Sequence, residues 1–273
     1  MRPRFVRIFV ALCGLPGFNK LTWKCLYSLM AHRYRGADWT FMNYGYVSSD
    51  RMTIPLDPAD EPNRNWIQLY HHVASSVNLR NRLVLEVGSG RGGGASFVKR
   101  YLEPELMIGV DLSGKAVTLC RSVHRVEGLE FRVGDAECLP VDSSSVDVVI
   151  NIESSHCYPD FEKFLSEVHR VLRPGGHFLY ADFRNRDSLN RWRDSLNHCG
   201  MHLIRETEIT GNVIAALERD DEVKRAFINR AVPRFLRPAL SEFAGMRGTE
   251  MFESFRNGNL TYSSFVLKKQ GVS

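Results

Sequence analysis

A glycine-rich turn after an apolar run is the feature of this chain that points most clearly to chemistry. Residues 84–94 read Val-Leu-Glu-Val-Gly-Ser-Gly-Arg-Gly-Gly-Gly. The apolar run predicts a buried β-strand, and the glycines predict a tight turn that opens a helix. Because Gly88 and Gly90 lack side chains, the backbone N–H groups of the turn can approach a ligand closely. We expect a side chain at position 88 to occupy the space of that ligand.

An aspartate follows the next apolar run. Residues 107–110 read Met-Ile-Gly-Val, and Asp111 comes directly after them. A carboxylate at the end of such a strand can accept hydrogen bonds from a ribose diol, which predicts a nucleotide-type cofactor. The glycines at 88, 90 and 93 also match the dinucleotide fingerprint, with an acidic residue roughly 20 positions further on. An NAD-dependent dehydrogenase is therefore one interpretation of these residues.

Three further motifs favour S-adenosylmethionine (SAM). Glu86 stands two residues before the first glycine, and Gly134-Asp135-Ala136-Glu137-Cys138-Leu139-Pro140 follows a third apolar run. Val171-Leu172-Arg173-Pro174-Gly175-Gly176 is typical of a helix end and a turn before a fifth apolar run. With these motifs in this order, residues 63–185 resemble the class I SAM-dependent methyltransferases.

The resemblance implies SAM as the cofactor and assigns contacts to residues near the ends of the strands. The glycine loop would wrap the methionine portion, the first aspartate would bind the ribose hydroxyls, and the second would accept a hydrogen bond from the adenine amino group. The residues that it assigns to cofactor binding are Glu86, Gly88, Ser89, Gly90, Asp111, Leu112, Asp135, Ala136 and Asn151.

The middle of the chain alternates strand and helix patterns. We expect strands at 83–87, 106–110, 129–133, 146–151 and 177–182, and helices near 92–102, 113–124 and 160–171. This spacing predicts βαβ units and a mostly parallel sheet, whose ligands bind outside the carboxyl ends of the strands. The fold class is therefore α/β, and the resemblance implies that it is a Rossmann-like class I methyltransferase. The resemblance implies a seven-stranded sheet with helices on both faces, and makes residues 260–268 an antiparallel edge strand.

The two ends of the chain differ from this core. Residues 1–62 are expected to form a helical and aromatic N-terminal segment, and residues 63–273 the methyltransferase domain. A helical insertion at about 207–257 would, with the N-terminal helices, cover a substrate. The segment 1–35 is basic, with no acidic residue before Asp38. A helix packed on the domain, a peripheral membrane contact and a targeting segment are all open for it.

Methyl transfer from SAM is an in-line displacement, so the enzyme mainly aligns the reactants and excludes water. A hydroxyl acceptor must also lose its proton, which favours a nearby base. His156 follows the fourth predicted strand and titrates near neutral pH, which makes it the best candidate for that base. Glu153 can orient His156 or replace it, and simple packing is the alternative for both. No acidic metal constellation is evident, so we predict metal-independent transfer.

An aromatic segment precedes the domain. Residues 41–46 read Phe-Met-Asn-Tyr-Gly-Tyr and resemble the segment that covers SAM in sterol, tocopherol and cyclopropane-fatty-acid methyltransferases. Tyr46 is therefore a candidate for a cation–π contact with the sulfonium, with plain core packing as the alternative.

Several regions together resemble a narrower family. Residues 60–64, 92–96, 155–159 and 248–249 are similar to those of the phthiotriol and phenolphthiotriol dimycocerosate methyltransferases and related lipid or polyketide O-methyltransferases. The similarity runs from about residue 19 to 268 and implies O-methylation of a hydroxyl on a hydrophobic small molecule. A C-methyltransferase of the sterol or quinone type and a non-catalytic SAM-binding protein remain as alternatives.

The composition narrows the class of protein and its possible partners. The chain has 273 residues, 44% of them hydrophobic and 25% charged, which is ordinary for a globular protein with one sizeable core. A net charge of +5 without a basic, aromatic stripe in the core region argues against nucleic-acid binding. The six cysteines form no C-x-x-C pair, which fits reduced thiols in a cytoplasmic protein. The sequence leaves the oligomeric state open.

Overall fold

The computed structural model describes residues 40–48, 54–234 and 236–271 of the chain. The basic segment at 1–35, the expected N-terminal helices and the expected membrane contact lie outside the described residues. Among the residues that are described, no helix has both the length and the apolar character that crossing a bilayer requires.

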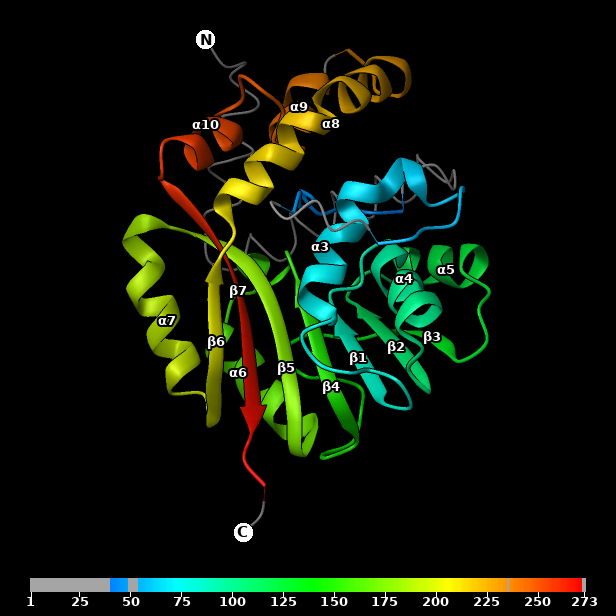
Figure 1. Cartoon of the computed structure of the whole chain (residues 1–273), viewed down its shortest axis with the longest axis vertical. Coiled ribbons are helices and arrows are strands. Elements are labelled where there is room, and N and C mark those ends of the chain that lie inside the picture. Colours follow the sequence, from blue (N-terminus) through cyan, green and yellow to red (C-terminus); the bar gives the residue numbers. More distant parts are fainter. Residues whose placement is uncertain (1–39, 49–53, 235, 272–273) are drawn as a thin grey trace.

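A seven-stranded sheet forms the centre of the fold (Figure 1). The strands are β1 (Leu83–Val87), β2 (Leu106–Asp111), β3 (Leu129–Val133), β4 (Val146–Ile152), β5 (Leu172–Asn185), β6 (Met201–Glu208) and β7 (Leu260–Lys269). Their order is β3-β2-β1-β4-β5-β7-β6. The first five strands are parallel, and β7 is antiparallel to both of its neighbours. The expected mostly parallel seven-stranded sheet is confirmed.

Helices cover both faces of this sheet. The α-helices are α3 (Arg64–Ala74), α4 (Gly93–Leu102), α5 (Gly114–Val123), α6 (Phe161–Val171), α7 (Leu189–Asn197), α8 (Thr210–Ala231), α9 (Arg237–Phe243) and α10 (Glu250–Arg256). Short 3-10 helices are η1 (Glu61–Asn63), η2 (Ser155–Cys157) and η3 (Arg186–Ser188). On β4, Val148 and Ile150 join the apolar cluster that contains residues of α3 and α4, whereas Val149 joins the cluster of α6 and α7. The strand alternation thus produces two cores.

The fifth strand is longer than the sequence predicts. Helix α6 ends at Val171, as expected, but β5 begins at once and includes Pro174-Gly175-Gly176. Val146 pairs with Leu172, whereas Val148 pairs with His177, so the extra residues form a bulge inside the strand. Gly175 has φ +82° there, a conformation that glycine adopts readily.

The last strand is not an edge strand, which corrects our expectation. β7 lies between β5 and β6 and is almost completely buried from Tyr262 to Leu267. The edge is β6, the strand that the sequence analysis did not locate, and its residues are half or fully exposed apart from Met201. An edge strand has one solvated side and tolerates this polar pattern, which weakens its signal in the sequence.

Three helices connect β6 to β7. Helices α8, α9 and α10 lie at one end of the sheet (Figure 1). Leu260 at the start of β7 pairs with Asn185 at the end of β5, so these helices stand beside the carboxyl ends of the parallel strands. That is the end at which ligands bind in sheets of this type.

Candidate functional site

A cavity lies at the carboxyl ends of β1 to β4. Its empty volume is about 1260 Å³, including the space that opens to solvent. Residues 40–43 form part of its wall, and the backbone N–H of Gly93 donates to the carbonyl of Thr40 over 3.2 Å. The predicted site residues that line it are Gly88, Ser89, Gly90, Asp111, Leu112, Asp135, Ala136 and Glu153. The structure therefore brings together eight residues from four separate loops.

The N–H groups of the glycine loop are already bonded within the protein. Gly88 and Ser89 donate to the carbonyl of Val110 over 2.8 and 3.0 Å, and Gly90 donates to Oδ2 of Asp111 over 2.8 Å. Our expectation that these groups point at a ligand is therefore wrong. A pyrophosphate needs such donors, whereas an ammonium group needs acceptors, so the loop suits the amino-acid end of SAM better than a dinucleotide.

Gly88 is required for packing, which corrects the reason we expected. A Cβ at this position would lie 2.3 Å from Oγ of Ser154 and 2.9 Å from the hydroxyl of Tyr158, and the backbone has φ +77°. The side chains beneath the loop thus fill that space. Gly90 differs, because a Cβ there would meet only Sδ of Met42, at 3.5 Å, and both residues line the cavity.

Asp111 is fixed at the cavity wall by two backbone groups. Its Oδ1 accepts from the N–H of Ser113 and its Oδ2 from that of Gly90, both over 2.8 Å. Burial raises the pKa of this carboxyl to about 6, although both N–H groups oppose the rise. Each oxygen has a second lone pair, so the oriented carboxylate can still accept hydrogen bonds from a ribose diol. Asp135 also lines the cavity and accepts from the N–H of Glu137 over 3.1 Å.

Two predicted contact residues lie beneath the wall. Glu86 is 1% exposed, and its Oε1 accepts from the hydroxyl of Tyr70 over 2.6 Å; burial raises its pKa to about 7. Nδ2 of Asn151 donates to Oγ of Ser154 over 2.7 Å and to the hydroxyl of Tyr158 over 3.1 Å. Tyr70, Ser154 and Tyr158 line the cavity, so Glu86 and Asn151 support that wall from behind.

The polar groups of the cavity fit SAM. Oγ of Ser89 is buried in the wall and has no hydrogen-bond partner among the described residues. A buried hydroxyl without a partner is costly and calls for a ligand. It lies in the loop that the resemblance assigns to the methionine portion, whose amino and carboxylate groups can satisfy it.

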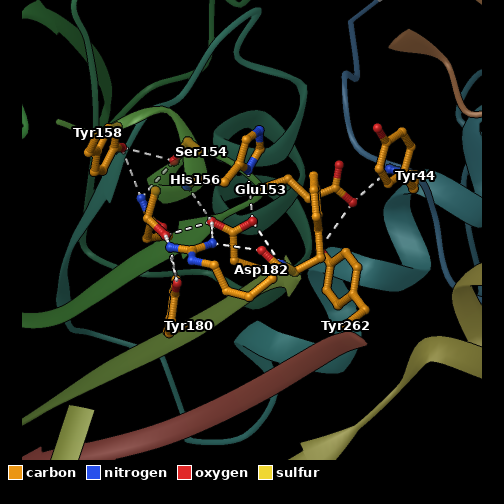
Figure 2. A network of polar contacts seen from close by, with 12 residues as sticks. Tyr44, Glu153, Ser154, His156, Tyr158, Tyr180, Asp182 and Tyr262 are labelled. Carbon is orange, nitrogen blue, oxygen red and sulfur yellow. Dashed lines mark hydrogen bonds and ion pairs between the residues drawn. The ribbon is translucent and has the colours of Figure 1, made fainter. Parts of the chain in front are cut away.

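Glu153 borders the cavity and is held in a strained conformation. Its φ is +48°, and its Oε1 accepts from the N–H of Tyr44 over 2.8 Å and from the hydroxyl of Tyr262 over 3.0 Å (Figure 2). Burial is the main cause that raises its pKa, to about 8. Strained, buried ionisable groups of this kind cluster at functional sites.

This raised pKa predicts a pH-dependent loss of stability. The unfolded chain releases the Glu153 proton near pH 4.3, whereas the folded protein keeps it until about pH 8. The penalty is therefore absent below pH 4, grows as the pH rises towards 8, and is constant above it. We expect Glu153→Gln to raise the Tm at pH 8.5 by roughly 3 °C or more over wild type, and by much less at pH 5, in thermal unfolding.

Exposed Glu222 on α8 provides the matched control for this titration. Glu222→Gln makes the same substitution at the surface, where such changes shift the Tm little. A pH-independent effect of Glu153→Gln would show that the carboxyl does not hold its proton in the fold.

His156 is bound to an aspartate that the sequence analysis missed. Its Nδ1 lies 2.8 Å from Oδ1 of Asp182, and its backbone N–H donates to Oδ2 over 3.0 Å (Figure 2). Burial opposes the charge on the imidazole, but the Cys157 thiol and the Asp182 carboxylate raise the pKa of His156 well above its ordinary value. Asp182, not Glu153, therefore orients the ring, which corrects the role that we expected for Glu153. His156 does not line the cavity, but its side chain is 21% exposed beside it.

Tyr46 also needs correction. Its ring stacks on His72 with the centroids 4.5 Å apart, and it does not line the cavity. The residues of its segment that do so are Phe41, Met42 and Asn43. The aromatic segment therefore contributes to the cavity wall, but its first residues do so and Tyr46 does not.

Asp182 has a sequence signal like those of the other site residues, since it follows an apolar run, Phe178 to Ala181, at the end of a parallel strand.

Comparisons with known proteins agree with this geometry. The profile of a family described as "Methyltransferase domain" matches residues 85–180. Phthiotriol/phenolphthiotriol dimycocerosates methyltransferase of Mycobacterium leprae is 41% identical over 97% of this chain and 99% of its own. Fatty-acid O-methyltransferase of Mycolicibacterium smegmatis is 37% identical over 90% of this chain and 89% of its own.

A solved structure shares the fold. Geranyl diphosphate C-methyltransferase from Streptomyces coelicolor A3(2), in complex with S-adenosyl-L-homocysteine, aligns with a TM-score of 0.64 and 17% identity, covering 89% of this chain and 98% of that one. The two relatives at 41% and 37% identity extend over most of their own length, and the profile covers the cavity-forming strands. The chain therefore belongs to the family of SAM-dependent methyltransferases that includes the phthiotriol/phenolphthiotriol dimycocerosates methyltransferases.

Proposed function

We propose that this enzyme methylates a hydroxyl oxygen on a hydrophobic small molecule of the lipid or polyketide type. The observation that carries the proposal is a histidine oriented by a buried aspartate beside the SAM cavity, His156 with Asp182. Such a pair can take the proton that a hydroxyl must lose. The names of the relatives, which specify phthiotriol-type and fatty-acid acceptors, support a lipid acceptor.

The residues of the site divide this work. When bound, SAM supplies a methyl group on a positively charged sulfur, which needs no further activation. Asp111 and Asp135 would hold the adenosine, and Ser89 the amino-acid end. Asp182 fixes Nδ1 of His156, so the proton of the acceptor would go to Nε2. Because Asp182 favours the charged imidazole, we expect activity to rise from neutral to alkaline pH.

Glu153 shapes the wall of the cavity. With a pKa of about 8, it holds its own proton at neutral pH and is a poor base there. Its side chain joins the segment 40–48 to β7 through Tyr44 and Tyr262. We assign it to positioning of the cavity wall, with His156 as the proton acceptor.

A buried aromatic cluster packs beside His156. The rings of Tyr44 and Phe183 lie 5.6 and 5.5 Å from that of Phe255 on α10, and the ring of His156 lies 4.5 Å from that of Phe183. These three rings are buried, so they pack α10 and the segment 40–48 against β5 beside His156. In this proposal residues 63–273 are the catalytic domain and helices α8 to α10 are the substrate cover. Contact of the basic segment 1–35 with a membrane surface remains a prediction.

The test is an acceptor panel with methyl-labelled SAM. It contains a long-chain diol, a long-chain phenol, a fatty acid and an unsaturated isoprenoid, with products identified by mass spectrometry. We expect methyl ethers from the diol or the phenol. If the methyl ester of the fatty acid is the sole product, the acceptor group is a carboxylate and not a hydroxyl. A new C–methyl bond would assign the enzyme to the C-methyltransferases.

A further inference from the structure

Arg184 shares the carboxylate that holds His156. On strand β5, Tyr180, Asp182 and Arg184 alternate with apolar residues, so their side chains lie on one face of the strand. Nη1 of Arg184 lies 3.3 Å from Oδ2 of Asp182, and Nδ1 of His156 lies 2.8 Å from Oδ1. Asp182 is completely buried, so its one negative charge serves two cationic groups in a medium that screens poorly.

The guanidinium of Arg184 is held in place by aromatic stacking and by hydrogen bonds. Its carbon lies 5.3 Å from the ring centroid of Phe161 and 4.9 Å from that of Trp192, between two aromatic side chains. Nη2 donates to Oγ of Ser155 over 2.8 Å, and that hydroxyl donates to Oδ2 of Asp182 over 2.6 Å. Arg184 thus reaches the same carboxylate oxygen by a direct ion pair and through Ser155. Its fork-shaped donor set and planar stacking are features that a lysine cannot reproduce.

Other ionisable groups belong to the surroundings of His156. Glu153 and Cys157 belong to its own loop, Asp182 and Arg184 come from β5, and Lys224 of α8 interacts with Glu153. The ring itself packs on Phe183. Of these groups, Arg184 is the cation that is bonded to the same carboxylate as the imidazole, so removal of its charge acts on His156 through Asp182.

We propose that Arg184 is a positioning residue of the transfer reaction, which fixes Asp182 and, by sharing its charge, allows His156 to release and regain a proton. This proposal rests on the proposed function, in which His156 accepts the proton of the acceptor. Without Arg184, the whole charge of Asp182 acts on His156. The imidazolium is then harder to deprotonate, and the base is available only at higher pH.

The experiment compares Arg184→Met, Arg184→Lys and Arg186→Met. Arg186 is exposed in η3, two residues after Arg184, so its replacement removes an equal charge outside the network. The first readout is the pKa of His156 in the absence of the acceptor. It is measured by NMR titration of histidine-labelled protein, and the signal of His156 is identified by its absence from His156→Ala. We expect Arg184→Met to raise it by about one unit, Arg184→Lys to leave it near the wild-type value, and Arg186→Met not to change it.

The second readout is the pH profile of kcat, measured also in the Glu153→Gln background so that the titration of Glu153, whose pKa is about 8, does not contribute to it. The acid limb should move to higher pH by the same amount in Arg184→Met. A raised pKa of His156 with an unmoved limb would keep the Arg184 coupling and reject His156 as the base. If the pKa of His156 does not change in Arg184→Met, the proposal is overturned, whatever the activity of that variant. If Arg184→Met does not fold, Arg184→Lys decides: it must keep the wild-type pKa and lose kcat.

Discussion

Replacing His156 by alanine is expected to slow methyl transfer by about 100-fold or more, with little change in SAM affinity. The imidazole is held to Asp182 on one side and packs on Phe183 on the other. It does not line the cavity, so its removal should leave the cofactor contacts in place. Turnover with labelled SAM and calorimetric titration of SAM measure the two effects separately.

The controls for this variant test the chemistry of the pair. His169→Ala removes a half-buried histidine from the last turn of α6, away from the cavity, and should keep wild-type turnover. Asp182→Asn keeps the shape of its residue but loses the charge that stabilises the imidazolium, so it should lose activity on the scale of His156→Ala. Unchanged turnover in His156→Ala would remove this residue from the mechanism.

The first four strands of the fold could be predicted almost residue by residue. β1 and β3 begin and end where the sequence analysis placed them, and β2 and β4 differ by one residue at their ends. Buried parallel strands are continuous apolar runs bounded by turn residues, which is a strong local signal. The place of β7 beside β6 is not local, because it depends on which strands pair after a helical connection of about fifty residues.

The cofactor side of the site followed from one rule, that ligands bind at the carboxyl ends of parallel strands. That rule placed Gly88, Asp111 and Asp135 on one cavity wall. What it does not give is the direction of each side chain. Asn151 also follows this edge of the sheet, yet it points beneath the wall, towards Val87. The partner of His156 was missed because the two residues are 26 positions apart and meet only when β4 and β5 pair.

Gly90→Val is expected to weaken SAM binding by about 100-fold or more, which corresponds to about 2.8 kcal/mol. A Cβ at this position enters the cavity beside Met42, with no closer atom to stop it. The two γ-methyl groups of valine then occupy space that the ligand needs. The N–H of Gly90 donates to Asp111, so a shift of the loop would also displace the carboxylate that we propose for ribose binding.

The control separates occupied space from backbone strain. Gly90 has φ +53° and Gly175 has φ +82°, so valine is strained at both, but nothing lies within 4 Å of a Cβ on Gly175. Both variants should therefore lose stability by about 1–3 kcal/mol, while only Gly90→Val should lose SAM affinity in calorimetry. Equal SAM affinities in the two variants would mean that the side of the loop facing Met42 is not where SAM binds, and the cofactor would have to occupy another part of the cavity.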